Sequence, residues 1–345
     1  MSTADALPAP SRELGEHLRL PGAEARPGAV RRVLVAEFMD ATGLGALAAR
    51  AEVSYLPMLG HDRAALLQAV RGTEALVVRN RCRVDADVLE AAGPALAVVG
   101  RLGAGLDNID TAACRAAGVQ VVFARGANAD AVCEYVFAGL LHLLRSLGAA
   151  DAAVRAGAWP REGYSGGELS GRTLGLLGLG EVGRRMARRA HAFGLPTIGY
   201  DPLVGADSPL LRGVPVTVLE FEEVLTGADI LSLHLPLLPA TRGLIGREAL
   251  ARMRPGAILV NAARGGIVDE AALAEALGDG RLGGAVLDVR EIEPPPQPDP
   301  LATAPRALLT PHIAGLTAEA QARVGLMVAE DILAVLAGRT PRSGA

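Results

Sequence analysis

The sequence contains no lysine, so all 34 of its basic residues are arginines. A chain without lysine cannot form the Schiff bases of pyridoxal enzymes and amine-catalysed aldolases. It also lacks the lysine that P-loop NTPases, protein kinases and Ser-x-x-Lys acyl enzymes require. Dehydrogenases built on a Tyr-x-x-x-Lys pair are excluded for the same reason. A genome that codes arginine in place of lysine is the simplest cause, and the exclusions hold whatever the cause.

Aromatic residues and net charge are also scarce. Phe, Trp and Tyr make up 3% of the chain, and the formal charge is −4. Both values argue against nucleic-acid binding, which needs a basic surface and stacking rings. Because half of the residues are hydrophobic and so few are aromatic, the core is expected to be aliphatic.

Cysteines are few, and they are not spaced as zinc-binding pairs, which is typical of a reduced, intracellular protein without a metal site. The N-terminus does not read as a signal peptide. The most apolar stretch, residues 132–147, is interrupted by Glu134, His142 and Arg145 and is too short to span a bilayer. We therefore expect a cytoplasmic enzyme with no membrane partner. The cysteines are Cys82, Cys114 and Cys133.

The pattern along the chain predicts two domains, as does the length of 345 residues. Short apolar runs alternate with helical patterns from residue 31 and again from residue 172. This alternation predicts parallel sheets with helices on both faces. Long amphipathic helices are expected at 128–147 and 318–337, and a ligand cleft is expected between the domains. The predicted divisions are a mobile tail at 1–30, an outer domain at 31–127 plus 312–345, and an inserted domain at 128–311.

A glycine-rich turn lies at the start of the second alternation. Gly178, Gly180 and Gly183 have the spacing G-x-G-x-x-G between an apolar strand and a helix. The first glycine permits the sharp turn, the second lets the backbone approach a pyrophosphate, and the third lets helix pack on strand. The amides of Glu181 and Val182 would face the phosphate. The pattern predicts a dinucleotide-binding domain.

Asp201 ends the next predicted strand, 21 residues after Gly180. That position suits a carboxylate that binds the hydroxyls of the adenosine ribose. A carboxylate repels a 2′-phosphate, and the following PLVGADS contains no arginine to hold one, so NAD is predicted over NADP. Asp201 could also be a turn residue before Pro202, or serve both purposes.

Polar residues follow three later strands of the same domain. Arg264, Asp288 with Glu293, and His312 each come just past an apolar run. Ligands of doubly wound sheets bind beyond the carboxyl ends of the strands, so these residues are expected to meet at the cofactor crevice. Taken singly, Arg264 could be a surface residue, Glu293 a turn cap and His312 a packed core histidine.

Together these residues suit hydride transfer between an alcohol carbon and nicotinamide. The hydroxyl proton needs a partner, and histidine is the natural one near neutral pH. A neighbouring carboxylate favours the imidazolium and fixes its orientation. A guanidinium binds a substrate carboxylate bidentately and stays charged. Of the other histidines, His234 ends a strand and could border the nicotinamide.

The chain resembles the D-isomer-specific 2-hydroxyacid dehydrogenase family, the group that contains phosphoglycerate dehydrogenase. The resemblance rests on GLLGLGEVG, NAARGGIVDE, LDVREIEP and TPHIAG and covers roughly residues 32–338. EFMD, VRNR and GRLGAGLDNID are most similar to sulfolactate dehydrogenase-type members. The resemblance implies two doubly wound parallel-sheet (Rossmann- or flavodoxin-like) α/β domains, with the cofactor domain inserted in the substrate domain. It also implies an NAD-dependent enzyme that interconverts a 2-hydroxy acid and its 2-keto acid.

The resemblance implies roles residue by residue. Arg264 binds and polarises the substrate, His312 donates the proton in reduction, and Glu293 is the partner of the histidine. Asp288 is expected to bind the nicotinamide carboxamide. Further expected cofactor contacts are Arg264, His312, His234, Pro236, Ala262, Ala263 and Gly315.

Substrate contacts are also expected in the outer domain. The resemblance implies that Ala104 and Gly105 offer backbone amides to the substrate carboxylate. Arg79 and Asn80, in VVRNR, end a strand, and Arg81, Arg101 and Arg125 add positive charge along the chain. We hypothesise a dianionic substrate whose second group is a sulfonate, phosphate or carboxylate. The alternative is that a chain with 34 arginines places some of them there without a function.

Two positions depart from the family pattern. Arg125 stands in place of a proline in ARGAN, and Arg290 stands where the family often has phenylalanine. Two other classes remain open: a formate- or phosphite-type dehydrogenase and a non-enzymatic NAD-sensing protein similar to corepressors of this fold. Formate enzymes of this superfamily pair the histidine with an amide, so Glu293 argues against them. The helix at 128–147 is apolar enough to predict a homodimer interface.

Overall fold

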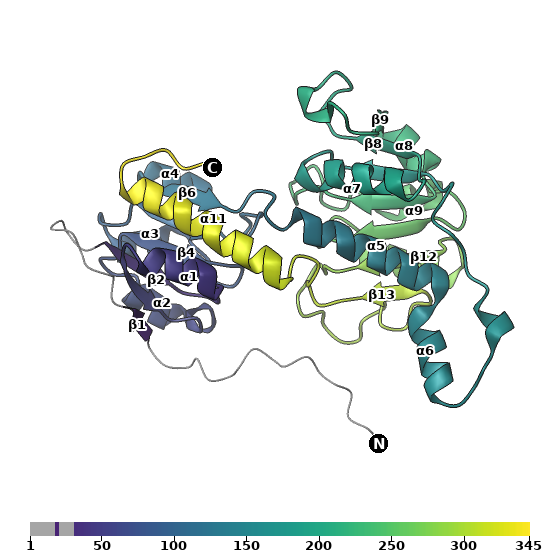
Figure 1. Ribbon diagram of the computed structural model, residues 1–345, viewed down its shortest axis with the longest axis horizontal. Helices are drawn as coiled ribbons and strands as arrows, with labels where there is room; N and C mark the ends of the chain where they lie inside the picture. The colour runs from purple at the N-terminus through teal and green to yellow at the C-terminus, as the bar shows by residue number, and fades with distance from the viewer. Residues whose placement is uncertain (1–17, 21–30) are drawn as a thin grey trace. The chain divides into compact units, whose positions relative to one another are not determined.

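The computed structural model describes residues 18–20 and 31–345 (Figure 1). Most of the expected N-terminal tail, residues 1–17 and 21–30, lies outside the described residues. Contacts divide the chain into two compact units. We call them the terminal unit, which runs to Asn128 and resumes at Ala318, and the central unit, Ala129–Thr317. The central unit extends beyond the expected residue 311. The backbone amides of residues 312–314 donate hydrogen bonds to Asp288, which attaches that segment to the central unit.

The terminal unit is built on a six-stranded sheet in the order β1-β3-β2-β4-β5-β6. All of its strand pairs are parallel except β1 with β3. Leu18–Leu20, which the sequence placed in the predicted mobile tail, form β1 and pair with β3. The strands are β1 Leu18–Leu20, β2 Arg32–Val35, β3 Glu52–Tyr55, β4 Ala75–Val78, β5 Val98–Arg101 and β6 Gln120–Phe123.

Helices cover both faces of this sheet. One face packs on α1 and α11, and the other on α2, α3 and α4. Each of the four short helices starts after an aspartate whose side chain accepts an amide of the first turn, which contributes about 1 kcal/mol per cap. The helices are α1 Ala41–Ala48, α2 Arg63–Ala69, α3 Ala86–Ala92, α4 Thr111–Ala116 and α11 Ala318–Leu336, with a 3₁₀ turn at Leu59–His61.

Glycine determines how closely α11 approaches the sheet. A side chain on Gly100, in β5, would lie 2.6 Å from Ile332 and 2.7 Å from Val328 of α11. The helix therefore packs directly on the strand, and this contact buries aliphatic side chains of the sequence segment expected at 318–337.

The central unit contains a seven-stranded sheet in the order β13-β12-β11-β10-β7-β8-β9. Every pair in it is parallel. Together with the terminal unit, it confirms the expected α/β fold with one doubly wound domain inserted in another. The strands are β7 Leu174–Leu177, β8 Thr197–Tyr200, β9 Thr217–Val218, β10 Ile230–Leu233, β11 Ile258–Asn261, β12 Gly284–Leu287 and β13 Ala307–Leu309.

Two helical layers enclose the central sheet. Neighbouring residues of one strand face opposite layers, as Ile230 and Leu231 do, which explains why these strands are continuously apolar. α5 and α7 lie on one face, and α8, α9 and α10 on the other. The helices are α5 Ala129–Arg145, α6 Leu147–Arg155, α7 Glu181–Ala192, α8 Phe221–Gly227, α9 Arg247–Arg252 and α10 Glu270–Gly278, with 3₁₀ turns at Arg161–Tyr164 and Pro209–Leu211.

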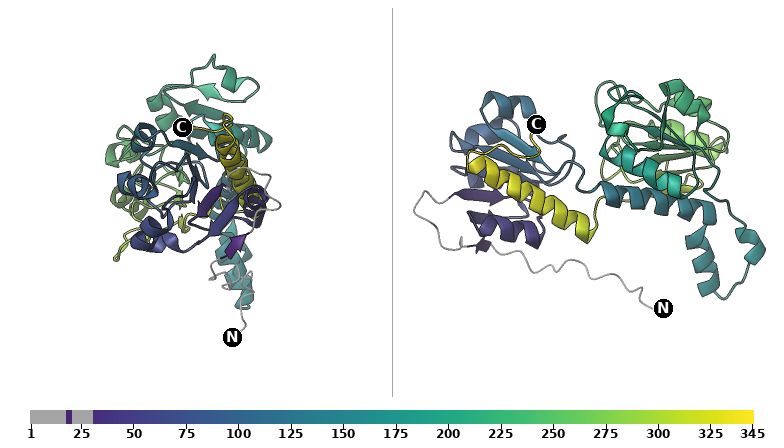
Figure 2. Two further views of the ribbon diagram at one scale, coloured as in Figure 1. Left: turned by 90° about the vertical axis from the view of Figure 1, so that its left-hand side faces the viewer. Right: turned by 45° about the horizontal axis from the view of Figure 1, so that its top comes forward.

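The single helix expected at 128–147 is shorter than predicted. Ser146 has a left-handed backbone with φ of 50°, which ends α5 and starts α6 in a new direction. The axes of α5 and α6 differ by 58°. α6 and the segment after it project from the rest of the central unit (Figures 1 and 2). No single helix of the described residues is long and apolar enough to cross a membrane, and only this bent pair has the length and composition to do so.

The strand order places a ligand crevice in the central unit. β8 lies on one side of β7, and β10, the next long strand, lies on the other. Such a topological switch point opens a crevice at the carboxyl ends of the strands. The segments that follow β7, β10, β11, β12 and β13 therefore all begin at one edge of the sheet.

Candidate active site

The glycine turn after β7 has the geometry that its three predicted roles require. Gly178 has φ of +100°, and a side chain there would lie 2.4 Å from the carbonyl oxygen of His234. A side chain on Gly183 would lie 2.0 Å from the Gly178 carbonyl oxygen, so α7 packs against the turn. At Gly180, which caps α7, a side chain would meet open space. The backbone is thus open to a ligand at the middle glycine.

The N-terminus of α7 can hold an anion. The amides of Glu181, Val182 and Gly183 are in the first turn and have no acceptor within the helix, and the helix dipole favours negative charge there. The Glu181 carboxylate is paired with Arg184 at 2.7 Å and Arg185 at 2.6 Å. These arginines offset a charge that would otherwise repel a phosphate.

Asp201, just past β8, holds the glycine turn in place. One carboxylate oxygen accepts the Leu179 amide at 2.9 Å, and the other accepts the Leu203 amide at 2.9 Å. The turn role left open by the sequence is thus present. Each oxygen retains a second lone pair that a ribose hydroxyl could use, so the predicted ribose contact stays a prediction.

His234 follows β10 beside the glycine turn. Burial lowers the pKa of this histidine to about 4, so its ring is neutral at pH 7. Its Nε2 lies 3.0 Å from the hydroxyl of Ser232. The neutral ring keeps a single N–H, and it lacks the additional acidic proton that an imidazolium gives up to a carbonyl oxygen. The structure therefore favours His312 over His234 as the proton donor.

His312 and Glu293 meet, although they are separated by a strand. His312 Nδ1 lies 2.9 Å from Glu293 Oε2, and 42% and 38% of these side chains are exposed, so a substrate can reach them. The backbone of His312 is left-handed, with φ of 59°, an uncommon conformation for a residue other than glycine. Such strain often marks a functional site.

The buried carboxylate of Asp288 holds the loop that carries this histidine. Asp288 is 1% exposed. One oxygen accepts the Thr310 hydroxyl at 2.6 Å and the Ile313 amide at 2.8 Å, and the other accepts the Ala314 amide at 2.7 Å. Thr310 also meets the Tyr135 hydroxyl of α5 at 2.6 Å. The sequence assigned Asp288 to a nicotinamide carboxamide and missed this loop-holding role; the carboxamide contact stays a prediction.

Arg264 lies in the turn after β11, which Asn261 shapes. The Asn261 side-chain amide donates to the Arg264 carbonyl at 2.8 Å, and its oxygen accepts the Ala263 amide at 3.1 Å. Asn261 is 2% exposed and was also missed, since nothing in the sequence distinguishes it from other strand-end residues. Three further predicted contacts follow strands at the same edge of the sheet: Pro236, Ala262 and Gly315.

In the terminal unit, the buried carboxylate of Glu37 organises the loop after β4. Glu37 is 4% exposed and accepts four consecutive amides. The distances are 2.7 Å from Arg79, 3.3 Å from Asn80, 3.1 Å from Arg81 and 3.0 Å from Cys82. Glu37 follows β2 and the loop follows β4, which lie side by side in the sheet. Glu37 thus fixes the backbone of two predicted substrate residues, a role the sequence did not reveal.

The side chains of this loop pack on rings. The Arg79 guanidinium lies 5.9 Å from the centre of the Phe38 ring, and burial lowers its pKa. Arg81 contacts His61 Nε2 at 3.0 Å. Ala104 and Gly105 lie in the turn after β5, the strand next to β4.

The three cysteines are buried and unpaired. Burial raises the pKa of Cys82 to about 12, of Cys114 to about 11 and of Cys133 to about 12. These thiols are poor nucleophiles because the thiolate is the reactive form. Among the described residues, no group of three His, Cys, Asp or Glu side chains could hold a metal ion.

Comparison with known proteins gives consistent matches. Residues 137–314 match the model of the D-isomer specific 2-hydroxyacid dehydrogenase NAD binding domain. The chain is 44% identical over 307 residues to (S)-sulfolactate dehydrogenase of Chromohalobacter salexigens, covering 89% of this chain and 99% of that one. It is 44% identical over 306 residues to D-3-phosphoglycerate dehydrogenase of Mycobacterium tuberculosis, covering 89% of this chain but only 57% of that longer protein.

Solved structures with a similar fold are consistent with these sequence matches. The TT0316 protein of Thermus thermophilus superposes with a TM-score of 0.83 at 37% identity, covering 91% of this chain and 99% of that one. A glyoxylate reductase from Paecilomyes thermophila gives a TM-score of 0.81 at 29% identity, covering 92% and 99%.

Proposed function

We propose a substrate class and residue roles for this chain, which belongs to the D-isomer-specific 2-hydroxyacid dehydrogenase family. The enzyme interconverts a hydroxy acid and its keto acid with NAD(H). The observation that carries the proposed mechanism is the 2.9 Å contact between His312 Nδ1 and Glu293 Oε2.

The residues at the switch point fit a dinucleotide. Gly180 leaves open space beside the unpaired first-turn amides of α7, which suits a pyrophosphate. NAD(H) held there would supply or accept the hydride. We assign a preference for NAD over NADP to Asp201, because its carboxylate would repel a 2′-phosphate and no arginine lies in the following PLVGADS.

His312 moves the proton. Its Nδ1 faces Glu293, which leaves Nε2 to donate to the substrate carbonyl oxygen in reduction and to accept the hydroxyl proton in oxidation. Glu293 orients the ring and favours the imidazolium. Arg264 binds the substrate carboxylate and polarises the carbonyl.

We assign the terminal-unit loop to a second anionic group on the substrate. Arg79, Asn80 and Arg81 lie at the carboxyl end of β4, with their backbone fixed by Glu37, and the turn with Ala104 and Gly105 follows the neighbouring strand. Two similar proteins are named for dianionic substrates, sulfolactate and phosphoglycerate. A small dianionic 2-hydroxy acid of this kind is therefore the proposed substrate.

The test compares kcat/KM for sulfolactate, phosphoglycerate and lactate with NAD, read from NADH absorbance. The proposal expects the two dianions to exceed lactate by at least about 10-fold, since a charge-assisted bond contributes about 1.5–3 kcal/mol. Equal values would refute the second anionic site. Oxidation of formate or phosphite alone, or NADH binding without any turnover, would support the two alternative classes.

We also propose a cytoplasmic homodimer. The apolar face of α5 is buried inside its own unit and is not free to form a dimer interface. We therefore propose that the projecting segment with α6 forms the interface in its place. There Leu147, Val154 and Trp159 are 55%, 50% and 80% exposed. Light scattering of Trp159→Ser beside the unchanged protein tests this: a dimer that persists with the same dissociation constant would contradict the assignment.

A further inference from the structure

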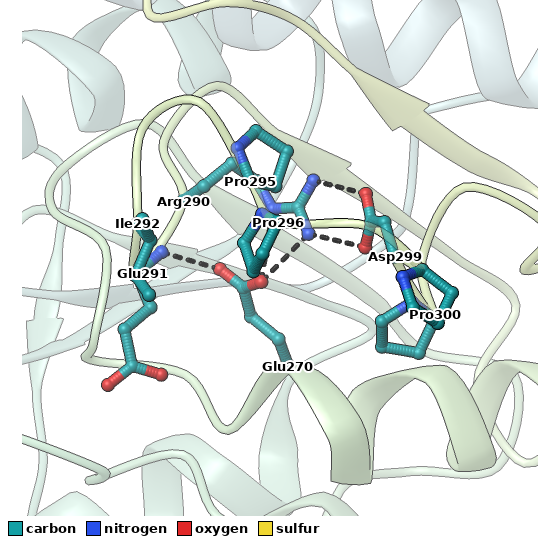
Figure 3. A pocket seen from close by; sticks show the side chains of 9 residues that line it. Glu270, Arg290, Glu291, Ile292, Pro295, Pro296, Asp299 and Pro300 are labelled. Carbon is teal, nitrogen blue, oxygen red and sulfur yellow. Dashed lines mark hydrogen bonds and ion pairs between the residues drawn. The ribbon is translucent and has the colours of Figure 1, made fainter.

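Arg290 is a buried cation between two carboxylates. Its side chain is 8% exposed, against 5% for Asp299 and 19% for Glu270 (Figure 3). Nη1 and Nη2 donate to the two Asp299 oxygens at 2.8 and 2.7 Å. Nε and Nη2 donate to Glu270 Oε2 at 3.1 and 2.8 Å. We call these three residues the Arg290 cluster.

The cluster holds part of a segment that has no regular secondary structure. Residues 288–306, between β12 and β13, are all described and contain no helix or strand. Arg290 lies near the start of this segment and Asp299 lies nine residues later, so their bidentate pair closes the loop between them. Glu270 anchors the segment to the first turn of α10, and its other oxygen accepts the Glu291 amide at 2.7 Å.

The backbone of Arg290 contacts Glu293 and also the residue next to Arg264. Its amide donates to Glu293 Oε1 at 3.1 Å, while Glu293 Oε2 meets His312. Its carbonyl oxygen would lie 1.8 Å from a side chain on Gly265, so it packs against the residue that follows Arg264. A shift of Arg290 therefore moves the Glu293 carboxylate relative to both Arg264 and His312.

The ionic state of the cluster is stable. The hydrogen bond with Asp299 raises the pKa of Arg290, and the same bond lowers the pKa of Asp299. Both stay charged over the range in which histidine titrates, so the cluster is a constant support. An uncharged side chain at this position could fill the space but could not form the ion pairs with Asp299 and Glu270.

We propose that Arg290, held by Asp299 and Glu270, is a positioning residue that sets the place of the Glu293 carboxylate and thereby the orientation and charge of His312. The inference rests on the proposed roles of Glu293 and His312. It assigns a function to a position that those roles do not use.

The test is Arg290→Met, which keeps much of the side-chain length and removes the cation. We expect kcat for keto-acid reduction to fall by about 10- to 100-fold, since small misplacements of reacting groups cost up to about 10²-fold. The KM for NADH should stay within about 2-fold, and the alkaline limb of the kcat profile should move to lower pH. In NMR spectra, the His312 ring should lose its proton at lower pH than in the unchanged protein, a readout that needs no turnover.

Arg247→Met is the matched control. Arg247 pairs with Glu275 in the same unit, but its side chain is 67% exposed, so its loss should leave rate and pH profile unchanged. An Arg290→Met enzyme with lower melting temperature but unchanged kcat and pH profile would overturn the proposal. If that variant does not fold, Asp299→Asn, which retains the Glu270 contacts, decides by the same two readouts.

Glu293→Gln distinguishes failure of the proposed role of Glu293 from failure of the positioning role of the Arg290 cluster. If it leaves the pH profile unchanged, the proposed role of Glu293 fails. If it moves the profile while Arg290→Met and Asp299→Asn do not, only the positioning role of the cluster fails.

Discussion

The carboxyl edges of the two sheets use the same device for different purposes. In the terminal unit, buried Glu37 binds four consecutive amides of the loop that carries Arg79 and Arg81. In the central unit, buried Asp288 binds two consecutive amides of the loop that carries His312. Each carboxylate fixes a loop backbone and leaves the side chains above it accessible. One loop then presents fixed positive charge and the other a group that can exchange a proton.

If the proposed roles hold, the terminal loop binds the substrate and the central loop carries the proton transfer. Loss of His312, the proposed proton donor, should then have the largest effect. We expect His312→Ala to lower kcat by about 10²- to 10⁴-fold, the usual contribution of a general acid or base. The dissociation constant of NADH, measured by fluorescence, should change little, because the imidazole handles only the proton. Loss of NADH binding would instead make His312 structural. His191→Ala, an exposed histidine of α7, is the control.

Replacement of the two buried carboxylates, Asp288 and Glu37, should change different kinetic parameters. Asp288→Asn should lower kcat by about 10- to 100-fold, because it loosens the His312 loop. Glu37→Gln should raise the KM of the proposed dianionic substrate and leave kcat within about 3-fold. Each change turns an amide group toward amide donors and should cost about 1–3 kcal/mol of unfolding free energy in urea. If both variants changed the same kinetic parameter, the division of roles would be wrong.

Glu293→Gln sharpens the central half of the comparison. In the proposed mechanism, reduction needs the imidazolium, which a neighbouring carboxylate favours. Removal of the carboxylate should move the alkaline limb of kcat/KM for reduction to lower pH, with rates near those of the unchanged enzyme at the acid end. Initial rates between pH 5 and 9 measure the shift.

His234→Gln should have the smallest effect, on stability. Burial lowers the pKa of His234 from 6.5 to about 4. In the unfolded chain, this imidazole is protonated below about pH 6.5, whereas in the folded chain it is protonated only below about pH 4. The free energy of unfolding therefore decreases as the pH falls through this window. The variant lacks this titration, and its urea midpoint should fall less between pH 7 and 5. An equal fall in both proteins would count against a desolvated ring.

Local patterns predicted the scaffold of the central edge. Gly178, Gly180 and Gly183 reveal a strand–turn–helix unit because their roles depend on neighbouring residues. The apolar runs likewise located most strands. The prediction of a single helix at 128–147 was wrong, because nothing in the local pattern indicates the left-handed backbone of Ser146.

The supports of the site depend on contacts between distant residues, so the sequence could not show them. Glu37 binds amides 42 to 45 positions away, and Glu270 meets Arg290 20 positions away. A buried carboxylate and an exposed one have the same letter in a sequence. The sequence marks Arg290 only as a departure from a family pattern, and its contacts with Asp299 and Glu270 are visible only in the structure.

Because Cys82, Cys114 and Cys133 are buried, the folded protein should react slowly with thiol reagents. These are all the cysteines of the chain, and each thiol stays protonated well above neutral pH. A cysteine introduced at an exposed position of either unit would therefore react alone with a maleimide or a spin label. Labelling pairs, one in each unit, would follow the motion of the enzyme in solution without replacing any native residue of its core.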